Sequence, residues 1–215
     1  GANGKPYLAN WKMWMVIIPQ VAVTVACAMG IGLQFKNGRF DFSGGAIMLV
    51  SAIIAGRMAQ AAGNNLVLMM GLCIVLCVAL SVIVGLFYIY SRVSVVIVTI
   101  GFAMLYEAVS CMIYKGEGIT LVSNMTLRVF ATYPYALAPL LASILIYAIY
   151  SYVTVSGKRA TLLSLNQKAA VNIGIKEKKN VIISFVFSGL IFGFATMIYA
   201  GNGIHQGAFT SMSTV

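Results

Sequence analysis

Residues 66–90 read LVLMMGLCIVLCVALSVIVGLFYIY, an apolar run of 25 residues without a charged side chain. A helix needs about 20 apolar residues to cross a bilayer, because each residue adds ~1.5 Å and the hydrocarbon core is about 30 Å thick. The run is therefore predicted to be a transmembrane helix.

Five further segments have the same character, so the chain is predicted to be an all-α, polytopic transmembrane helical bundle with about six spans. The second segment is short and carries Arg57 near its end, so a tilted, broken or partly re-entrant helix is the alternative there. We treat residues 1–215 as a single transmembrane domain. Besides 66–90, the expected spans are 14–33, 42–59, 93–114, 133–155 and 181–200.

Composition excludes several classes of protein. Hydrophobic residues make up 61% of the chain and charged residues 8%, against roughly 25% charged in an average soluble domain. So few charges exclude an ordinary soluble enzyme, a secreted disulfide scaffold and a nucleic-acid-binding domain. The four cysteines lie in apolar runs and are interpreted as buried apolar side chains rather than metal ligands or disulfides.

The net charge of +10 is concentrated in short connecting segments, which indicates orientation in the membrane rather than nucleic-acid binding. Segment 156–180 carries six Lys or Arg against one acid, Glu177, so the positive-inside rule places it in the cytoplasm. Counting spans outward from it leaves nine basic residues inside and five outside. The nine are the six of this segment with Lys36, Arg39 and Arg92.

Groups that could carry catalysis are nearly absent. His205, the single histidine, lies in a Gly-rich tail without a partner, so we assign it no catalytic role. Gly157-Lys158 lacks the remainder of a phosphate-binding loop, so no nucleotide site is expected.

Glu107 is the one acid well inside an expected span, a position that by default indicates function. It either lines a polar pathway, pairs with Arg57, or carries a proton in a coupled transporter. The alternative is an acid near the outer interface that is hydrogen-bonded to a neighbouring helix. The sequence favours none of these.

Segment 162–175 reads LLSLNQKAAVNIGI and is predicted to form a short amphipathic helix that ends at Gly174. Its apolar side would hold Leu162, Leu165, Ala169 and Ile173. Such a helix either docks into a groove of a partner protein or lies on the membrane surface, and its pattern does not discriminate between the two.

Small residues recur at helical spacing in two of the spans. Ala22, Ala26 and Gly30 repeat every four residues, and Gly189 with Gly193 forms a GxxxG pattern. Either pattern is typical of closely packed membrane helices, and the alternative is chance in spans rich in Gly and Ala.

The sequence LNQKAAVNIGIKEKKN, followed by VIISFVFSGLIFGFA, resembles bacterial ABC importer permeases of the ribose and branched-chain amino acid type. That family has a GNxxAAxxxGI pattern before a span that reads like SGxxAGxAG; its first Gly is Leu165 here. The matching residues are Asn166, Ala169, Ala170, Gly174 and Ile175, then Ser188, Gly189, Gly193 and Ala195.

Two further regions carry the same resemblance, which covers the chain from about Tyr7 onward. GRFDFSGGAIMLVSAIIAG is similar to the family's GGIDLSVGSLLALTG-like segment, with Asp41 and Ser43 matched. YSRVSVVIVTIGFAMLYEAV is similar to a YLRIPPFIATLGTLLIYRG-like segment, with Glu107 in place of a common Arg and Ser94 and Val95 in place of prolines. The matched residues of that segment are Arg92, Thr99, Gly101 and Tyr106.

The resemblance implies a multi-pass permease subunit of an ATP-binding cassette importer in the bacterial cytoplasmic (inner) membrane. The implied solute is small, and a monosaccharide such as ribose fits the motifs best; nucleosides or branched-chain amino acids are the alternatives. A proton-coupled secondary transporter that uses Glu107 is less favoured.

The implied partners are a cytoplasmic ABC ATPase subunit, a second permease subunit, an extracytoplasmic solute-binding protein and the lipid bilayer. ATP and Mg would belong to the ATPase, so this chain would be no enzyme and would hold no cofactor or metal. Segment 156–180 becomes the coupling loop, with Asn166, Ala169, Ala170, Gly174 and Ile175 at the ATPase. Asp41 and Ser43 would lie near the pathway, and the residues that bind the solute stay unassigned.

The ends of the chain also fit that family. The sequence opens with Gly1 rather than Met, and residues 1–12 would be external before the first expected span. Since such permeases have one helix before this point and several after Val215, we expect an internal piece of a longer subunit.

Overall fold

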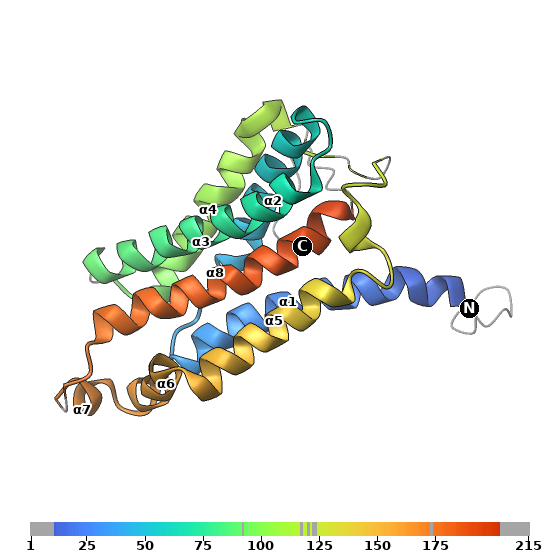
Figure 1. The fold of residues 1–215 in the computed structure, drawn as a ribbon. Coiled ribbons are helices and arrows are strands. Elements are labelled where there is room, and N and C mark those ends of the chain that lie inside the picture. The colour runs from blue at the N-terminus through green and yellow to red at the C-terminus, as the bar shows by residue number, and fades with distance from the viewer. Residues whose placement is uncertain are drawn as a thin grey trace, which may run out of the picture.

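The computed structural model describes residues 11–91, 93–116, 118–119, 121, 124–172 and 174–202. Helices are the regular elements of this part of the chain, so the predicted all-α bundle is confirmed (Figure 1). His205 lies outside the described residues. The elements are α1 (Trp11–Lys36), α2 (Gly44–Ala61), α3 (Leu66–Ser91), α4 (Val95–Met112), η2 (Ile113–Gly116), η3 (Val129–Ala131), α5 (Leu137–Ala148), η4 (Ile149–Val153), α6 (Val155–Leu165), α7 (Gln167–Asn172) and α8 (Glu177–Gly201).

Five of the described helices, α1, α2, α3, α4 and α8, are long and apolar enough to cross a membrane. A sixth span is added if the bent helix pair Leu137–Val153 and Val155–Leu165 is counted as one span. The expected count of about six therefore holds. The fifth span differs most from its expected range, because its α-helix starts only at Leu137 and passes into the π-helical turn η4.

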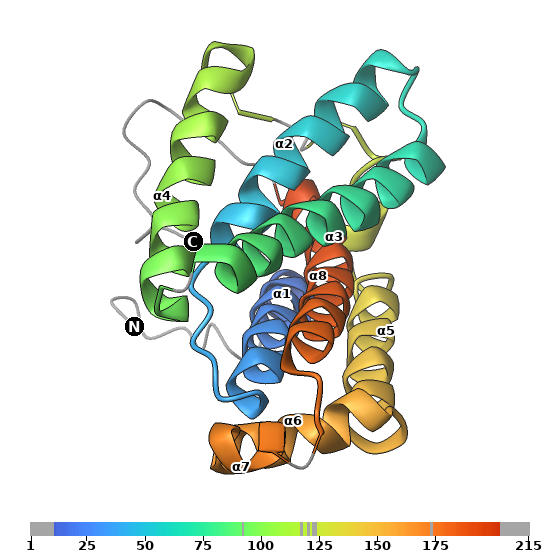
Figure 2. The same ribbon diagram turned by 90° about the vertical axis from the view of Figure 1, so that its left-hand side faces the viewer.

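Helix α8 lies at the centre of the bundle. In its most apolar stretch 67% of the residues are buried, as in α2, against 28% in α1, α3 and α4. Figure 2 shows α8 almost end-on, with α1 and α5 on either side of it and α3 crossing above. α4 lies at the edge of the bundle against α2 and α3.

The GxxxG pattern brings α8 against α3. A Cβ atom on Gly189 would lie 2.8 Å from Cα of Val78, and one on Gly193 would lie 2.8 Å from Cα of Ile74. Both glycines are therefore needed for this helix spacing, and the packing interpretation is confirmed. The facing stripe on α3 consists of small, fully buried residues, Cys73, Cys77 and Ser81, whose two thiols are free as expected.

The second small-residue stripe packs α1 on the other side of α8. Ala22, Ala26 and Gly30 are buried, and Ser188 donates a hydrogen bond to the carbonyl of Gly30 at 3.0 Å. A Cβ atom at Gly30 would lie 2.5 Å from the ring of Phe192. This interpretation is also confirmed.

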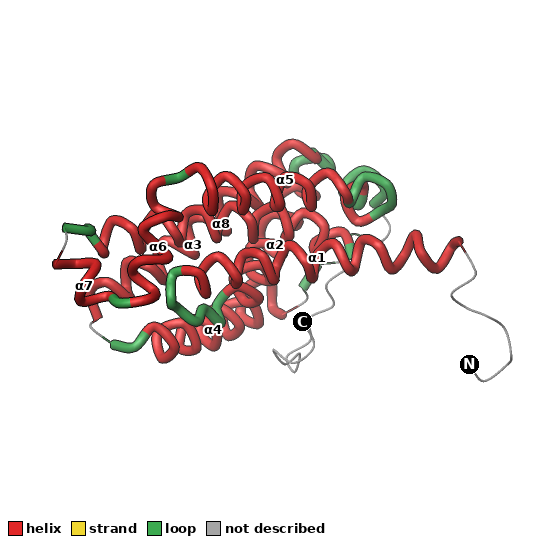
Figure 3. Tube along the Cα trace, turned by 90° about the horizontal axis from the view of Figure 1, so that it is seen from below, coloured by secondary structure: helices red, strands yellow, loops and turns green. Residues whose placement is uncertain are grey.

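The bundle has two distinct ends. We call the end that carries α6 and α7 the loop end; Figure 3 shows it opposite the first turn of α1. Lys36 reaches it and donates to the carbonyl of Ser151 at 3.3 Å. At the other end, here the far end, the ring of Trp11 meets Tyr133 edge-on at 6.0 Å. Segment 156–180 and Lys36 thus lie at the same end, as the charge count requires.

Candidate functional site

The connection between α5 and α6 is a sharp bend of 71° at Thr154. The Thr154 hydroxyl donates to the carbonyl of Tyr150 at 2.6 Å and accepts from the amide of Gly157 at 3.1 Å. A Cβ atom on Gly157 would collide with that same Tyr150 carbonyl, a backbone atom that cannot rotate away. The bend therefore requires glycine here, and it turns α6 across the loop end of the bundle (Figure 2).

Asn166 divides the predicted amphipathic helix into two helices. Its backbone is extended (φ −153°, ψ 97°), so α6 ends at Leu165 and α7 begins at Gln167. Asn favours such breaks because its side chain competes for backbone hydrogen bonds. The expectation of one helix through 162–173 is therefore wrong. Gly174 ends α7 as predicted, with φ +91° and its amide bonded to the carbonyl of Val171 at 2.9 Å.

The break also changes which residues are buried. Leu163, Ala170 and Ile175 form a small core between α6, α7 and the start of α8. Leu162 and Leu165, assigned to one apolar side of the helix, are 48% and 79% exposed. The expected residues do not share one helix, because Leu162 and Leu165 lie on α6 and Ala169 lies on α7. The exposure of the two leucines is what an apolar surface facing a partner or the membrane would show. Ile173 and the side chain of Ala169 lie outside the described residues.

We refer to α6, α7 and the turn up to Ile175 as the two-helix segment. A buried polar cluster, the anchor cluster, ties it to the bundle. The Tyr150 hydroxyl and the Asn180 amide both donate to Oδ1 of Asn37, each at 3.1 Å. The Ser156 hydroxyl in turn donates to Oδ1 of Asn180. The cluster therefore joins the ends of α1 and η4 to the starts of α6 and α8.

The chain from Asn37 to Ser43 runs from this cluster back into the bundle. Asn37 bonds Asn180, Arg39 donates to the Ser184 hydroxyl at 3.2 Å, and Gly44, the first residue of α2, faces the ring of Phe192. The part of α8 between Asn180 and Phe192 is about 18 Å long at ~1.5 Å per residue. Residues 37 and 38 form the turn that ends α1, with Gly38 at φ +71°. The residues after this turn carry the chain along that part of α8, so α2 begins deep in the bundle.

Asp41 and Ser43 lie inside the bundle at the start of α2. Oδ1 of Asp41 accepts from the Ser43 amide at 2.8 Å and from its hydroxyl at 2.6 Å. Oδ2 of Asp41 is buried and has no hydrogen-bond partner. Asp41 and Ser43 therefore contact each other, and they are separate from the predicted site residues of the two-helix segment.

Glu107 joins neither group. The Glu107 side chain is half-buried in α4. Thr99, earlier on the same helix, donates to the carbonyl of Phe40 at 3.3 Å and therefore lies at the depth where α2 begins. Glu107 follows Thr99 by about 12 Å of helix at ~1.5 Å per residue. The Nε of Arg57 donates to the carbonyl of Gly118 at 2.9 Å.

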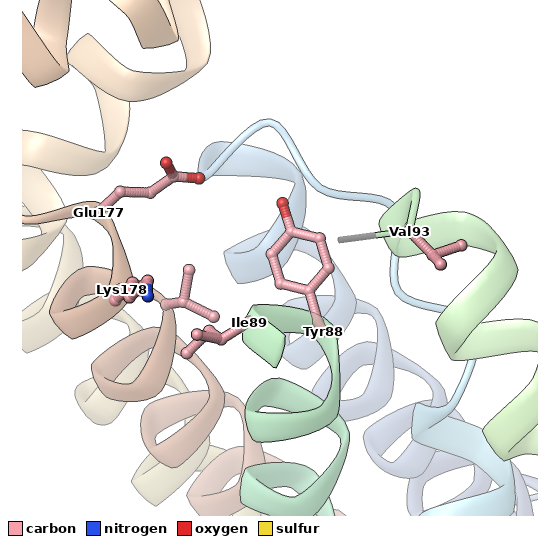
Figure 4. Close-up of a pocket in the computed structure, with 6 residues that line it drawn as sticks. Tyr88, Ile89, Val93, Glu177 and Lys178 are labelled. Atoms are coloured by element: carbon pink, nitrogen blue, oxygen red, sulfur yellow. The ribbon is translucent and has the colours of Figure 1, made fainter. Parts of the chain in front are cut away.

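A cleft opens at the loop end where α3, α4 and α8 meet (Figure 4). Its volume is about 230 Å³, and the carboxylate of Glu177 and the hydroxyl of Tyr88 face its opening. The side chains that line it are Tyr88, Ile89, Val93, Glu177, Lys178 and Val181. A second cleft, which shares Tyr88 and Glu177, continues toward Arg39 and Ser164.

Two groups of residues are therefore candidates for function: the two-helix segment with its anchor cluster, and segment 38–43 before α2. Within the described ranges, no three His, Cys, Asp or Glu side chains gather closely enough to hold a metal ion.

A family profile described as branched-chain amino acid transport system / permease component matches residues 14–213. The chain belongs to this family. No curated protein and no solved structure matches it significantly. As a permease component with several apolar helices, it is a multi-pass membrane protein of a transport system. The profile spans both candidate groups.

The anchor cluster of this permease component was missed by the sequence analysis. Asn37, Tyr150, Ser156 and Asn180 are polar residues next to helix ends, where polar residues are common. Asn180 follows directly on four charged residues, so the sequence gives no signal that it is buried, at 3% exposure in the fold.

Proposed function

We propose that this permease component is the membrane-spanning subunit of an ATP-driven importer in the bacterial cytoplasmic membrane, and that its two-helix segment contacts a cytoplasmic ABC ATPase. The observation that carries the proposal is a loop with exposed apolar residues that is nevertheless fixed to the bundle. Leu162, Leu165 and Val171 are exposed on it, the last at 44%. Apolar side chains exposed together on a short helical surface favour a protein contact.

The anchor cluster supports the same proposal, because a surface that receives force must be connected to the helices that move. Ser156 of α6 donates to Asn180 at the start of α8, and Asn180 donates to Asn37 at the end of α1. Coupling requires that the ATPase contacts this segment differently in its nucleotide-bound and nucleotide-free states.

The proposed assembly contains two permease subunits, two ATPases and an extracytoplasmic solute-binding protein. ATP and Mg are bound and ATP is hydrolysed on the ATPase, so this chain acts without catalysing the reaction. Asn166, Ala169, Ala170, Gly174 and Ile175 form the ATPase contact in this assembly.

For the solute we propose a small neutral monosaccharide such as ribose, on the basis of the sequence motifs. The family description names branched-chain amino acids, so leucine is the direct rival and nucleosides are a third class. The rival mechanism, proton-coupled transport through Glu107, would need no ATPase.

The test is uptake into proteoliposomes that contain the complete complex and the solute-binding protein. We expect ATP-dependent accumulation of ribose that a non-hydrolysable ATP analogue abolishes and a protonophore leaves unchanged. Accumulation of leucine instead would overturn the solute and keep the mechanism. Uptake that stops with the protonophore, and in a Glu107→Gln variant, would overturn the ATP-driven mechanism.

A further inference from the structure

The segment before α2 has an inverted pattern of exposure. Arg39, Asp41 and Ser43 are buried at 5%, 2% and 0% exposure, whereas Phe40 and Phe42 are 54% and 47% exposed. Exposure alternates from Arg39 to Ser43, so the polar residues face the bundle and both phenyl rings face outward. The ring of Phe35 adjoins that of Phe40 at 4.8 Å.

The backbone of this segment is not paired either. Within the described part of the chain, the amides of Phe40, Asp41 and Phe42 form no hydrogen bond with a backbone or side-chain group. The carbonyl of Phe40 does have a partner, because it accepts from Thr99 of α4. The segment therefore has three backbone donors without a partner among the described residues, at the depth of the bundle where α2 begins.

Lipid cannot cover such a surface. Hydrocarbon offers no acceptor to the free amides, and non-helical backbone at membrane depth occurs only where protein or a water-filled cavity covers it. An apolar protein contact would also leave these amides unsatisfied at a high cost. Water satisfies them, and exposed aromatic rings beside a few polar groups are typical of surfaces that bind small molecules.

We propose that segment 38–43 forms one wall of a water-filled solute pathway, and that the rings of Phe40 and Phe42 are the surface along which the solute passes. The proposal deepens the proposed function and rests on it. It assigns Asp41 and Ser43 a positioning role: their hydrogen bonds fix the turn into α2 and so keep the two rings directed outward.

The test is cysteine reactivity in the assembled transporter, in a background where Cys27 and Cys111 are replaced by Ala. We expect a charged methanethiosulfonate to modify Phe40→Cys and Phe42→Cys at least about tenfold faster than Ser43→Cys, because a thiol ionises readily only in water. The lipid-side control is Val75→Cys on α3, where the residue is 63% exposed. Equal rates at positions 42 and 75 would overturn the proposal.

A second measurement separates this proposal from the proposed function. Modification of Phe42→Cys is expected to reduce ATP-driven ribose or leucine uptake at least fivefold, whereas the same reagent leaves the Val75→Cys transporter active. Rapid modification with unchanged uptake would overturn the solute passage. If the unmodified transporter takes up neither solute, the proposed function fails, and the labelling rates alone still decide whether the segment faces water.

Discussion

The side-chain amide of Asn180, in the first turn of α8, donates to Oδ1 of Asn37 at 3.1 Å across 143 residues of sequence. Tyr150 bonds the same oxygen and Ser156 bonds Asn180, so four elements meet at this point. All four side chains are buried. The cluster therefore acts as a joint between the two-helix segment and the helices α1 and α8.

Removing Asn180 should weaken this joint and the fold together. Asn180→Ala removes the acceptor of the buried Ser156 hydroxyl and one of the two donors to Oδ1 of Asn37, so we expect the free energy of unfolding to fall by about 1–3 kcal/mol. Denaturant unfolding in detergent measures it, with the exposed Gln20→Ala as a control that changes it by less than about 0.5 kcal/mol. Additive effects of Asn37→Ala and Asn180→Ala would contradict a shared cluster.

Because α3 and α8 are in close contact, adding one methyl group at Gly189 is predicted to lower the stability of the bundle. Gly189→Ala places a Cβ atom against the backbone of Val78, so the helices must separate, and we expect a loss of about 1–3 kcal/mol of stability. Gly71→Ala on α3 is the matched control, because nothing lies within 4 Å of its Cβ position. Thermal unfolding of the two variants compares them, and equal melting temperatures would refute the packing argument.

Gly174 should be required for coupling rather than for insertion. Its φ of +91° strains any branched side chain, so Gly174→Val is expected to displace the end of α7 at a cost of about 1–3 kcal/mol. We expect this variant to insert normally but to hydrolyse ATP without solute uptake. Gly174→Asn, which tolerates positive φ better, should retain more of the uptake. Normal uptake and solute-stimulated ATPase activity in Gly174→Val would argue against the assignment.

Orientation can be tested independently of transport. Lys178 is exposed at the loop end, and Met125 is 89% exposed on the loop at the far end. A membrane-impermeant thiol reagent is expected to label Lys178→Cys only from the cytoplasmic side and Met125→Cys only from outside. The reverse pattern would invert the topology.

The spans and their contacts could be predicted from sequence because both depend on local patterns. A charge-free run such as 66–90 defines a span by length alone, and Gly189 with Gly193 defines a packing face by spacing. The second span, for which a tilted, broken or partly re-entrant helix is the alternative, starts deep in the bundle at Gly44.

The remaining features do not follow from helical periodicity. The break at Asn166 is local, but a helical period assumes an unbroken helix and cannot indicate it. The anchor cluster joins residues more than a hundred positions apart. The outward rings of Phe40 and Phe42 contradict the usual burial of aromatic residues, so only the fold shows which side of the segment they face.

The central claim is that the two-helix segment contacts the cytoplasmic ABC ATPase of the transporter. Disulfide crosslinking between Leu165→Cys and cysteines introduced on the membrane-facing surface of the ATPase tests it directly, because this side chain is the most exposed apolar one of α6. We predict a crosslink whose yield changes when ATP binds, with none from Met125→Cys at the far end. A transporter that is active but forms no crosslink from position 165 or its exposed neighbours, Leu162 and Val171, would contradict the account.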